Sequence, residues 1–285
     1  FAELTIMSAD ALTIQYEDAR AMRRWVVDGG IIESTRSGDD LSVRGDFSLL
    51  GGRDFATTLQ INYKSKIGSR EGEFGASFED MPADDIAHQA PAMAWLGALK
   101  APISGAVRGS LTEDGKLGLL NATLQIGKGV VQPTDETSPI PFNSARSYFS
   151  YDPNSAEIIF DELSIQSKWV NARADGQAKL VGIQKGWPTA ILGQLTFTNI
   201  FANPKNLYAE PIELEGASVD LKLQMDPFRL KLGEMTLRDQ GQVLAVSGDL
   251  HAKEDGWDLT LSGRMQALSP ERLLMLWPKS LGIKT

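Results

Sequence analysis

Strict alternation of apolar and polar residues is the feature that most limits what this chain can fold into. In "SVDLKLQM", Val219, Leu221, Leu223 and Met225 alternate with polar residues, so in an extended chain they share one face. The alternation recurs in "LNATLQI", "LTIQY", "LQINY", "LSIQ", "LTFT" and "WDLTLS". Strands with one apolar and one polar face are typical of antiparallel sheets. With the intervening turn signals "EDGK", "YDPN" and "KEDGW", they predict a mainly β protein of about 14–18 strands.

Glycines recur inside the predicted strands. Gly45, Gly109 and Gly248 each precede an apolar residue by two positions. A glycine inside a strand often marks a bulge or a bend. Recurring bends predict a long curved antiparallel sheet, a half-pipe whose apolar face forms a groove. The alternative is a set of ordinary glycines in a closed sandwich, and the period-two pattern is the same in both.

Two proline-marked segments interrupt the strands and predict a few short helices. Residues 82–100 can supply one or two helical turns and then a short apolar helix. In "LSPERLLMLWP", Ser269 suits an N-cap, Pro270 suits the first helical position and Pro278 ends the run, so we predict a helix over residues 269–276.

The two segments also resemble each other. Met81 aligns with Leu268 at the same offset of 187 positions that aligns Pro91 with Pro278. We expect both helices to cover an open end of the sheet. Residues 1–285 should then form one elongated modular β domain, with a segment boundary near residues 78–102.

Charge and composition exclude several functions. The formal net charge is −9 and there is no cysteine, which argues against nucleic-acid binding and excludes thiolate metal sites and cysteine nucleophiles. No stretch approaches the roughly 18 apolar residues of a membrane span. Phe1 opens the chain in mid-pattern, so we expect a fragment of a longer protein.

The chain lacks a recognisable catalytic constellation. His88 and His251 are not in a metal-ligand spacing, and the acidic pairs are Asp39–Asp40, Asp84–Asp85 and Asp161–Glu162. Adjacent residues of a strand point to opposite faces, so each pair makes a poor glycosidase dyad. We therefore expect no enzyme activity, no cofactor and no metal.

The order of the motifs resembles the AsmA-like family of bacterial envelope proteins, in its YhdP-like and TamB-like branches. The resemblance rests on "FEDMPADDIAHQAPAMAWLGALKAPISGAVRGSLTEDGKL", "LNATLQIGKGVVQP", "FSYDPNSAEIIFDELSIQS", "VNARADGQAKL" and "LSPERLLMLWP", and runs from about Leu41 onward. It implies a periplasmic β-sheet with an apolar groove, anchored in the inner membrane through a segment absent here. Such a segment would bind or conduct phospholipid, or another acyl-chain lipid, between the inner and outer membranes.

If the groove reading is correct, mid-strand apolar residues should line it. The candidates are Leu124, Ile126, Phe160, Ile165, Leu195, Phe197, Leu221, Leu223 and Met225. Two other readings stay open. One is a non-catalytic elongated β scaffold for envelope assembly. The other is a carbohydrate-active β protein that uses Trp25, Trp169, Trp187 and Trp257.

Overall fold

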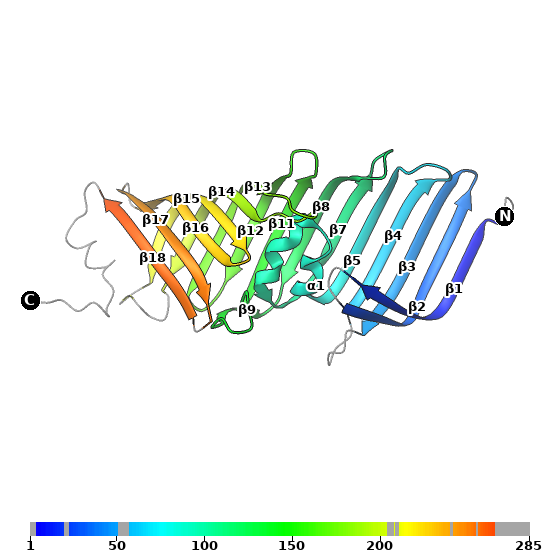
Figure 1. Ribbon diagram of the computed structural model, residues 1–285, viewed down its shortest axis with the longest axis horizontal. Helices are drawn as coiled ribbons and strands as arrows, with labels where there is room; N and C mark the ends of the chain where they lie inside the picture. The colour runs from blue at the N-terminus through cyan, green and yellow to red at the C-terminus, as the bar shows by residue number, and fades with distance from the viewer. Residues whose placement is uncertain are drawn as a thin grey trace, which may run out of the picture.

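The computed structural model describes residues 4–19, 23–50, 57–203, 208, 211–239, 242–254 and 256–265. Within these ranges the protein is mainly β, and one antiparallel sheet of fifteen strands runs the length of the molecule (Figure 1). The strand order follows the chain, and the edge strands β1 and β18 do not pair with each other. The predicted long antiparallel sheet is therefore confirmed, and it is not closed into a barrel.

The strands of this sheet are mostly long, and each one between the two edges pairs with the strand before and the strand after it. They are β1 (Ile6–Asp18), β2 (Arg23–Ser37), β3 (Asp40–Leu50), β4 (Thr57–Lys66), β5 (Gly72–Pro82), β7 (Pro102–Leu111), β8 (Leu117–Ile126), β11 (Ser144–Asp152), β12 (Glu157–Gln166), β13 (Val170–Val181), β14 (Ala190–Ala202), β15 (Ile212–Met225), β16 (Phe228–Asp239), β17 (Gln242–Lys253) and β18 (Gly256–Met265).

The remaining elements form a small cap on one face of the sheet. The cap consists of α1 (Ala83–Ala87), the 3-10 helix η1 (Pro91–Ala98) and a second sheet of β6 (Leu99–Lys100), β9 (Gly129–Val131) and β10 (Ile140–Phe142). Pro91 stands at the start of η1, where its missing N–H costs no helical hydrogen bond. The helical turn and the short apolar helix predicted between residues 82 and 100 are thus present, the second as a 3-10 helix.

The position of the cap differs from the expectation. We expected the first helical segment to cover an open end of the sheet, but it lies against the face of the central strands (Figure 1). The reason is that β5 pairs directly with β7, so residues 83–101 leave the sheet and return to the neighbouring strand. The sheet itself passes from β5 directly to β7, on either side of this excursion. The helix predicted over residues 269–276 lies outside the described residues.

The sheet folds back over its own capped face toward its C-terminal end. In Figure 1, β17 and β18 cross in front of β13–β15. η1 lies close to β15, and the side chain of Trp257 on β18 reaches the segment before β10. At the other end, Ile14 and Trp25 of β1 and β2 pack against the same central core.

The strand glycines make room for neighbouring side chains. A Cβ on Gly45 would lie 2.6 Å from the ring of Phe47, and one on Gly109 would lie 2.6 Å from the ring of Phe74. Gly109 adjoins a register shift between β7 and β8, whereas Gly45 lies in regular pairing. The predicted bulge therefore exists at Gly109 but not at Gly45, where the glycine allows an aromatic ring to lie over the strand.

Candidate functional site: the capped apolar face

One face of the large sheet carries an unbroken line of apolar residues from edge to edge. Residues paired directly across neighbouring strands share a face, and the pairing connects one residue of each strand into a single row. We call it the apolar row: Ala9, Ile32, Gly45, Ile61, Ala76, Val107, Ala122, Phe149, Phe160, Gly176, Leu195, Val219, Met235, Val246 and Gly263. No member of the row is polar. We call the face that carries it the apolar face.

All nine predicted groove residues lie on the apolar face. Phe160 and Leu195 belong to the row itself. Six others lie two, four or six residues from the member of the row on their own strand, and Ile165 is placed on this face by its pairing with Ala145. Ile126 and Ile165 both pair with Ala145, and Leu223 pairs with Ile191. Val219, Leu221, Leu223 and Met225 share this face, as their alternation predicts.

The depth of these residues changes along the sheet. Leu124 is 0 % exposed, and Ile126 and Phe160 are also buried. The remaining six candidates are only half-buried: Ile165, Leu195, Phe197, Leu221, Leu223 and Met225. At the last strand, Leu259 and Leu261 on the same face are 56 % and 57 % exposed. The apolar face is thus a packed core under the cap and an accessible surface beyond it.

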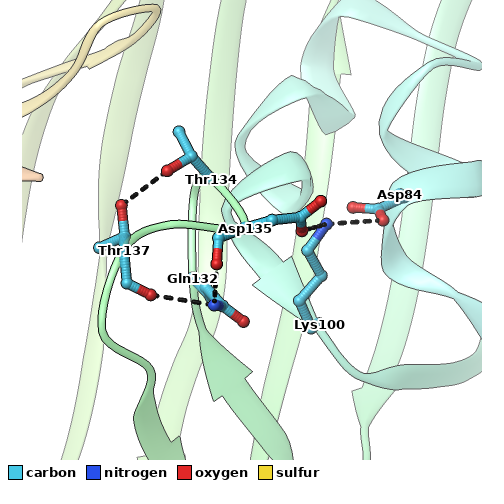
Figure 2. Close-up of polar contacts among 6 residues, drawn as sticks. All are labelled: Asp84, Lys100, Gln132, Thr134, Asp135 and Thr137. Carbon is cyan, nitrogen blue, oxygen red and sulfur yellow. Dashed lines mark hydrogen bonds and ion pairs between the residues drawn. The ribbon is translucent and has the colours of Figure 1, made fainter. Parts of the chain in front are cut away.

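The cap is tied down by polar contacts on its outer side. Lys100 Nζ lies 3.1 Å from Asp84 Oδ2 and 3.8 Å from Asp135 Oδ1 (Figure 2). The side-chain amide of Gln132 donates to the carbonyl oxygens of Asp135 and Thr137, at 3.1 and 2.9 Å. These contacts link α1, β6 and the segment after β9, so the cap is one connected unit.

A cavity of about 190 Å³ lies between the cap and the sheet. Trp95, Leu99, Val131 and Phe142 of the cap line one side. On the sheet side the apolar lining consists of Ile126, Ala145, Leu163, Ile165, Ala172 and Phe197. Three of these, Ile126, Ile165 and Phe197, are predicted groove residues. An apolar cavity of this kind suits a hydrocarbon guest and offers little to water.

Sequence reasoning missed the cap side of the cavity. Trp95 and Leu99 belong to the apolar stretch "PAMAWLGAL", whose sequence predicts a helix over the end of the sheet. The mean apolar character of that stretch was the available signal. It indicates burial, but it does not indicate against which strands.

Ser147 and Tyr151 are two polar side chains buried on the apolar face. Ser147, which pairs with Leu124 and Leu163, is 0 % exposed, and its hydroxyl has no hydrogen-bond partner among the described residues. Tyr151 is buried on the same face, and burial raises the pKa of its phenol. Neither side chain forms part of a catalytic arrangement.

The opposite face is polar and bears cross-strand pairs. Arg229 and Asp249 form an ion pair between β16 and β17, and Arg173 Nη2 lies 3.0 Å from Glu162 Oε2. Hydrogen bonds from the guanidinium of Arg229 lower the pKa of the Asp249 carboxyl. Such pairs on a wet face set strand register and solubility, and exposed ones contribute little stability.

The other sequence candidates are scattered. His88 and His251 lie on the cap and on β17, and no group of three metal-binding side chains occurs in the part of the chain that the structure describes. The four tryptophans occupy separate places. Trp25 packs on the core, Trp187 meets His88 edge to face, Trp257 meets Phe228, and Trp169 lies in the turn between β12 and β13. None of the described helices has the length and hydropathy that a membrane span requires.

No protein-family model, curated protein or solved structure matches this chain.

Proposed function

We propose that the protein binds acyl-chain lipid, phospholipid in particular, on its apolar face and conducts it along the apolar row. The observation that carries this proposal is the apolar row itself, which crosses all fifteen strands of the described sheet without a polar residue. A sheet that served only as a scaffold has no need for such a line to continue onto strands where the face is open to solvent.

The dimensions favour long apolar cargo. Strands lie about 4.8 Å apart, so a row of fifteen strands covers roughly 65 Å. A bilayer core of about 30 Å holds two acyl chains end to end, so the row exceeds the length of several chains. Burial of an acyl chain contributes about 0.8 kcal/mol per CH₂, and a uniform apolar wall lets that chain shift along it at little cost.

The exposed end of the face supports the same proposal. Leu259 and Leu261 lie two residues apart on β18 and stand more than half exposed on the apolar side. Contiguous exposed apolar surface on a protein marks a site that another apolar surface covers. In this proposal the covering group is lipid, the protein is a non-catalytic segment of an AsmA-like protein, and it acts in the periplasm with an inner-membrane anchor elsewhere in the longer chain.

A second candidate is the elongated scaffold for envelope assembly. It is favoured by the full burial of Leu124 and the burial of Ile126 beneath the cap, because there the apolar face is already covered by the protein itself.

Native mass spectrometry tests the two candidates. The chain is purified from a bacterial host in a mild detergent-free buffer and then mixed with phosphatidylethanolamine vesicles. The lipid proposal expects mass adducts of phospholipid, both as purified and after vesicle exposure. A chain that carries no lipid and takes none from the vesicles would leave the scaffold as the function.

A further inference from the structure

A segment of the cap contacts the last strand of the described sheet, β18. We call residues 132–139, which join β9 to β10, the strap. The indole Nε1 of Trp257 on β18 donates a hydrogen bond of 2.6 Å to the carbonyl oxygen of Ser138 in the strap. The two residues are 119 positions apart, and the contact exists because the sheet folds back over its capped face.

Trp257 is oriented for this contact by its own strand. It lies two residues before Leu259, so it projects from the apolar face. Its ring meets Phe228 of β16 edge to face, with centroids 5.7 Å apart and an interplanar angle of 84°. The indole therefore has an apolar body in contact with the sheet and a polar tip on the strap.

The strap is held firmly at its cap end. Gln132 donates to two carbonyl oxygens within the strap, the hydroxyl groups of Thr134 and Thr137 lie 2.8 Å apart, and Thr137 is 1 % exposed (Figure 2). Lys100 adds an ion pair with Asp135. The strap thus forms a compact loop on the cap, held by several contacts that do not involve β18.

The sheet end of the contact is less constrained. In the described sheet β18 is the last strand and pairs only with β17. Leu259 and Leu261, on either side of the β18 centre, are more than half exposed. Strands β16–β18 can therefore swing away from the strap together, with their pairing and the contact between Trp257 and Phe228 intact.

We propose that the hydrogen bond between Trp257 and Ser138 is a clasp. When it is formed, the strap and β18 together enclose the apolar face, and when it breaks, lipid enters from the side. This rests on the proposed function, because it names the regulation of the same site. When the clasp is closed, cargo reaches the cavity beneath the cap only along the apolar row. When β18 moves away, the half-buried residues of β14 and β15 become more accessible from the side.

The clasp has a clean test because the chain contains no cysteine. Glu136 in the strap and Thr260 on β18 are both exposed. Each is replaced by cysteine, and the two cysteines are spin-labelled. The distance between the labels is measured by pulsed electron resonance without lipid. Trp257→Phe keeps an aromatic ring against Phe228 and removes the donor. Ser138→Ala is the matched control, since the acceptor is a backbone carbonyl that this variant retains.

The expected result is a longer and broader distance distribution in Trp257→Phe and an unchanged one in Ser138→Ala. Loss of one hydrogen bond should raise the open fraction about fivefold, the equivalent of about 1 kcal/mol. An identical distribution in Trp257→Phe and the parent protein would overturn the clasp.

A cross-link separates the clasp from the proposed function. The same two cysteines are joined by a reducible linker, and uptake of a fluorescent phospholipid from phosphatidylcholine vesicles is followed before and after reduction. The clasp predicts at least fivefold slower uptake while the link is intact. Equal uptake in both states overturns the clasp and leaves lipid binding standing. Absence of uptake in both states contradicts lipid binding, and the label distances then still decide whether the clasp exists.

Discussion

Gly105 on β7 lies so close to β8 that a Cβ added to it would be 2.2 Å from the carbonyl oxygen of Thr123. Gly105 pairs directly with Leu124, the most deeply buried of the predicted groove residues. The two strands that carry the cap therefore approach each other at a point where no side chain fits. The glycine is required by this close approach of two backbones.

Replacement of Gly105 by alanine should consequently force β7 and β8 apart. We expect Gly105→Ala to lower the free energy of unfolding by about 1–3 kcal/mol, the range for overpacked sites. Gly97→Ala is the control, because its Cβ would meet only the Cβ of Ala87 at 3.7 Å. That variant should be neutral or slightly stabilising. Urea denaturation of both variants measures the difference, and equal midpoints would refute the steric argument.

Truncation of Leu124 tests whether the capped part of the apolar face is a packed core. The side chain is fully buried, so Leu124→Ala should cost about 3–5 kcal/mol through lost burial and a residual cavity. Leu223→Ala, at a half-buried position of the same face, should cost clearly less. Thermal unfolding followed by circular dichroism compares them. A loss at Leu223 as large as at Leu124 would mean that β15 is as tightly packed as β8.

A charge on the open part of the apolar face should remove lipid without unfolding the protein. In Leu223→Asp the carboxylate keeps partial access to water, so the stability cost is modest, whereas a fully buried charge would cost several kcal/mol. Leu192→Asp serves as the control, because Leu192 lies on the opposite face and is 42 % exposed. We expect lipid adducts to disappear in Leu223→Asp and to persist in Leu192→Asp, both with native circular dichroism spectra. Full lipid retention by folded Leu223→Asp would exclude that position from the lipid path.

Filling the cavity beneath the cap should compete with lipid. Ala172 is half-buried and lines the 190 Å³ cavity. In the Ala172→Phe variant the phenylalanine ring can therefore occupy the space of this cavity. We expect unchanged or raised thermal stability and at least a tenfold loss of lipid bound per protein. Ala106→Phe, on the opposite face of β7, should leave lipid binding as it is. Normal lipid binding by Ala172→Phe would place the lipid outside the cavity.

The acid response of the β16–β17 pair follows from its ion pair. Arg229 lowers the pKa of Asp249 by hydrogen bonding to its carboxylate. Because the pKa of Asp249 is lower in the folded protein than in the unfolded one, the ion pair stabilises the hairpin at pH values above the unfolded pKa of about 3.9. This contribution is lost as the pH falls through the folded pKa. An NMR titration should give Asp249 a midpoint below the ordinary value of an aspartate, and Arg229→Gln should raise it. The Asp114 pKa, held at about 2 by Lys116 and Thr112, should not move in that variant.

The strand pattern predicts which face a residue occupies much better than how deeply it is buried. Leu124 and Leu223 have the same alternating neighbours, and both lie on the apolar face, yet one is sealed under the cap and the other is half-exposed. Alternation depends only on the local geometry of an extended chain, whereas depth depends on what lies above the strand.

Contacts between distant segments are the part that the sequence leaves open. The hydrogen bond between Trp257 and Ser138 depends on the accumulated curl of seven intervening strands of the large sheet, from β11 to β17. Each register shift and bulge along the way changes that curl slightly, so no local motif identifies the partner. The position of the first helical segment was missed for the same reason, because its apolar residues fit any apolar surface.

The order of the strands has one further consequence for a protein of this shape. Since each strand of the large sheet pairs only with its neighbours along the chain, adding or deleting a hairpin at either edge leaves the other pairings in place. The stability of such an array is close to a sum over adjacent units, and unfolding should begin at the edges. Each hairpin contributes about 10 Å to the long axis. The span of the protein can therefore evolve in steps of two strands, and a gap of a given width between two surfaces can be matched by the number of hairpins alone.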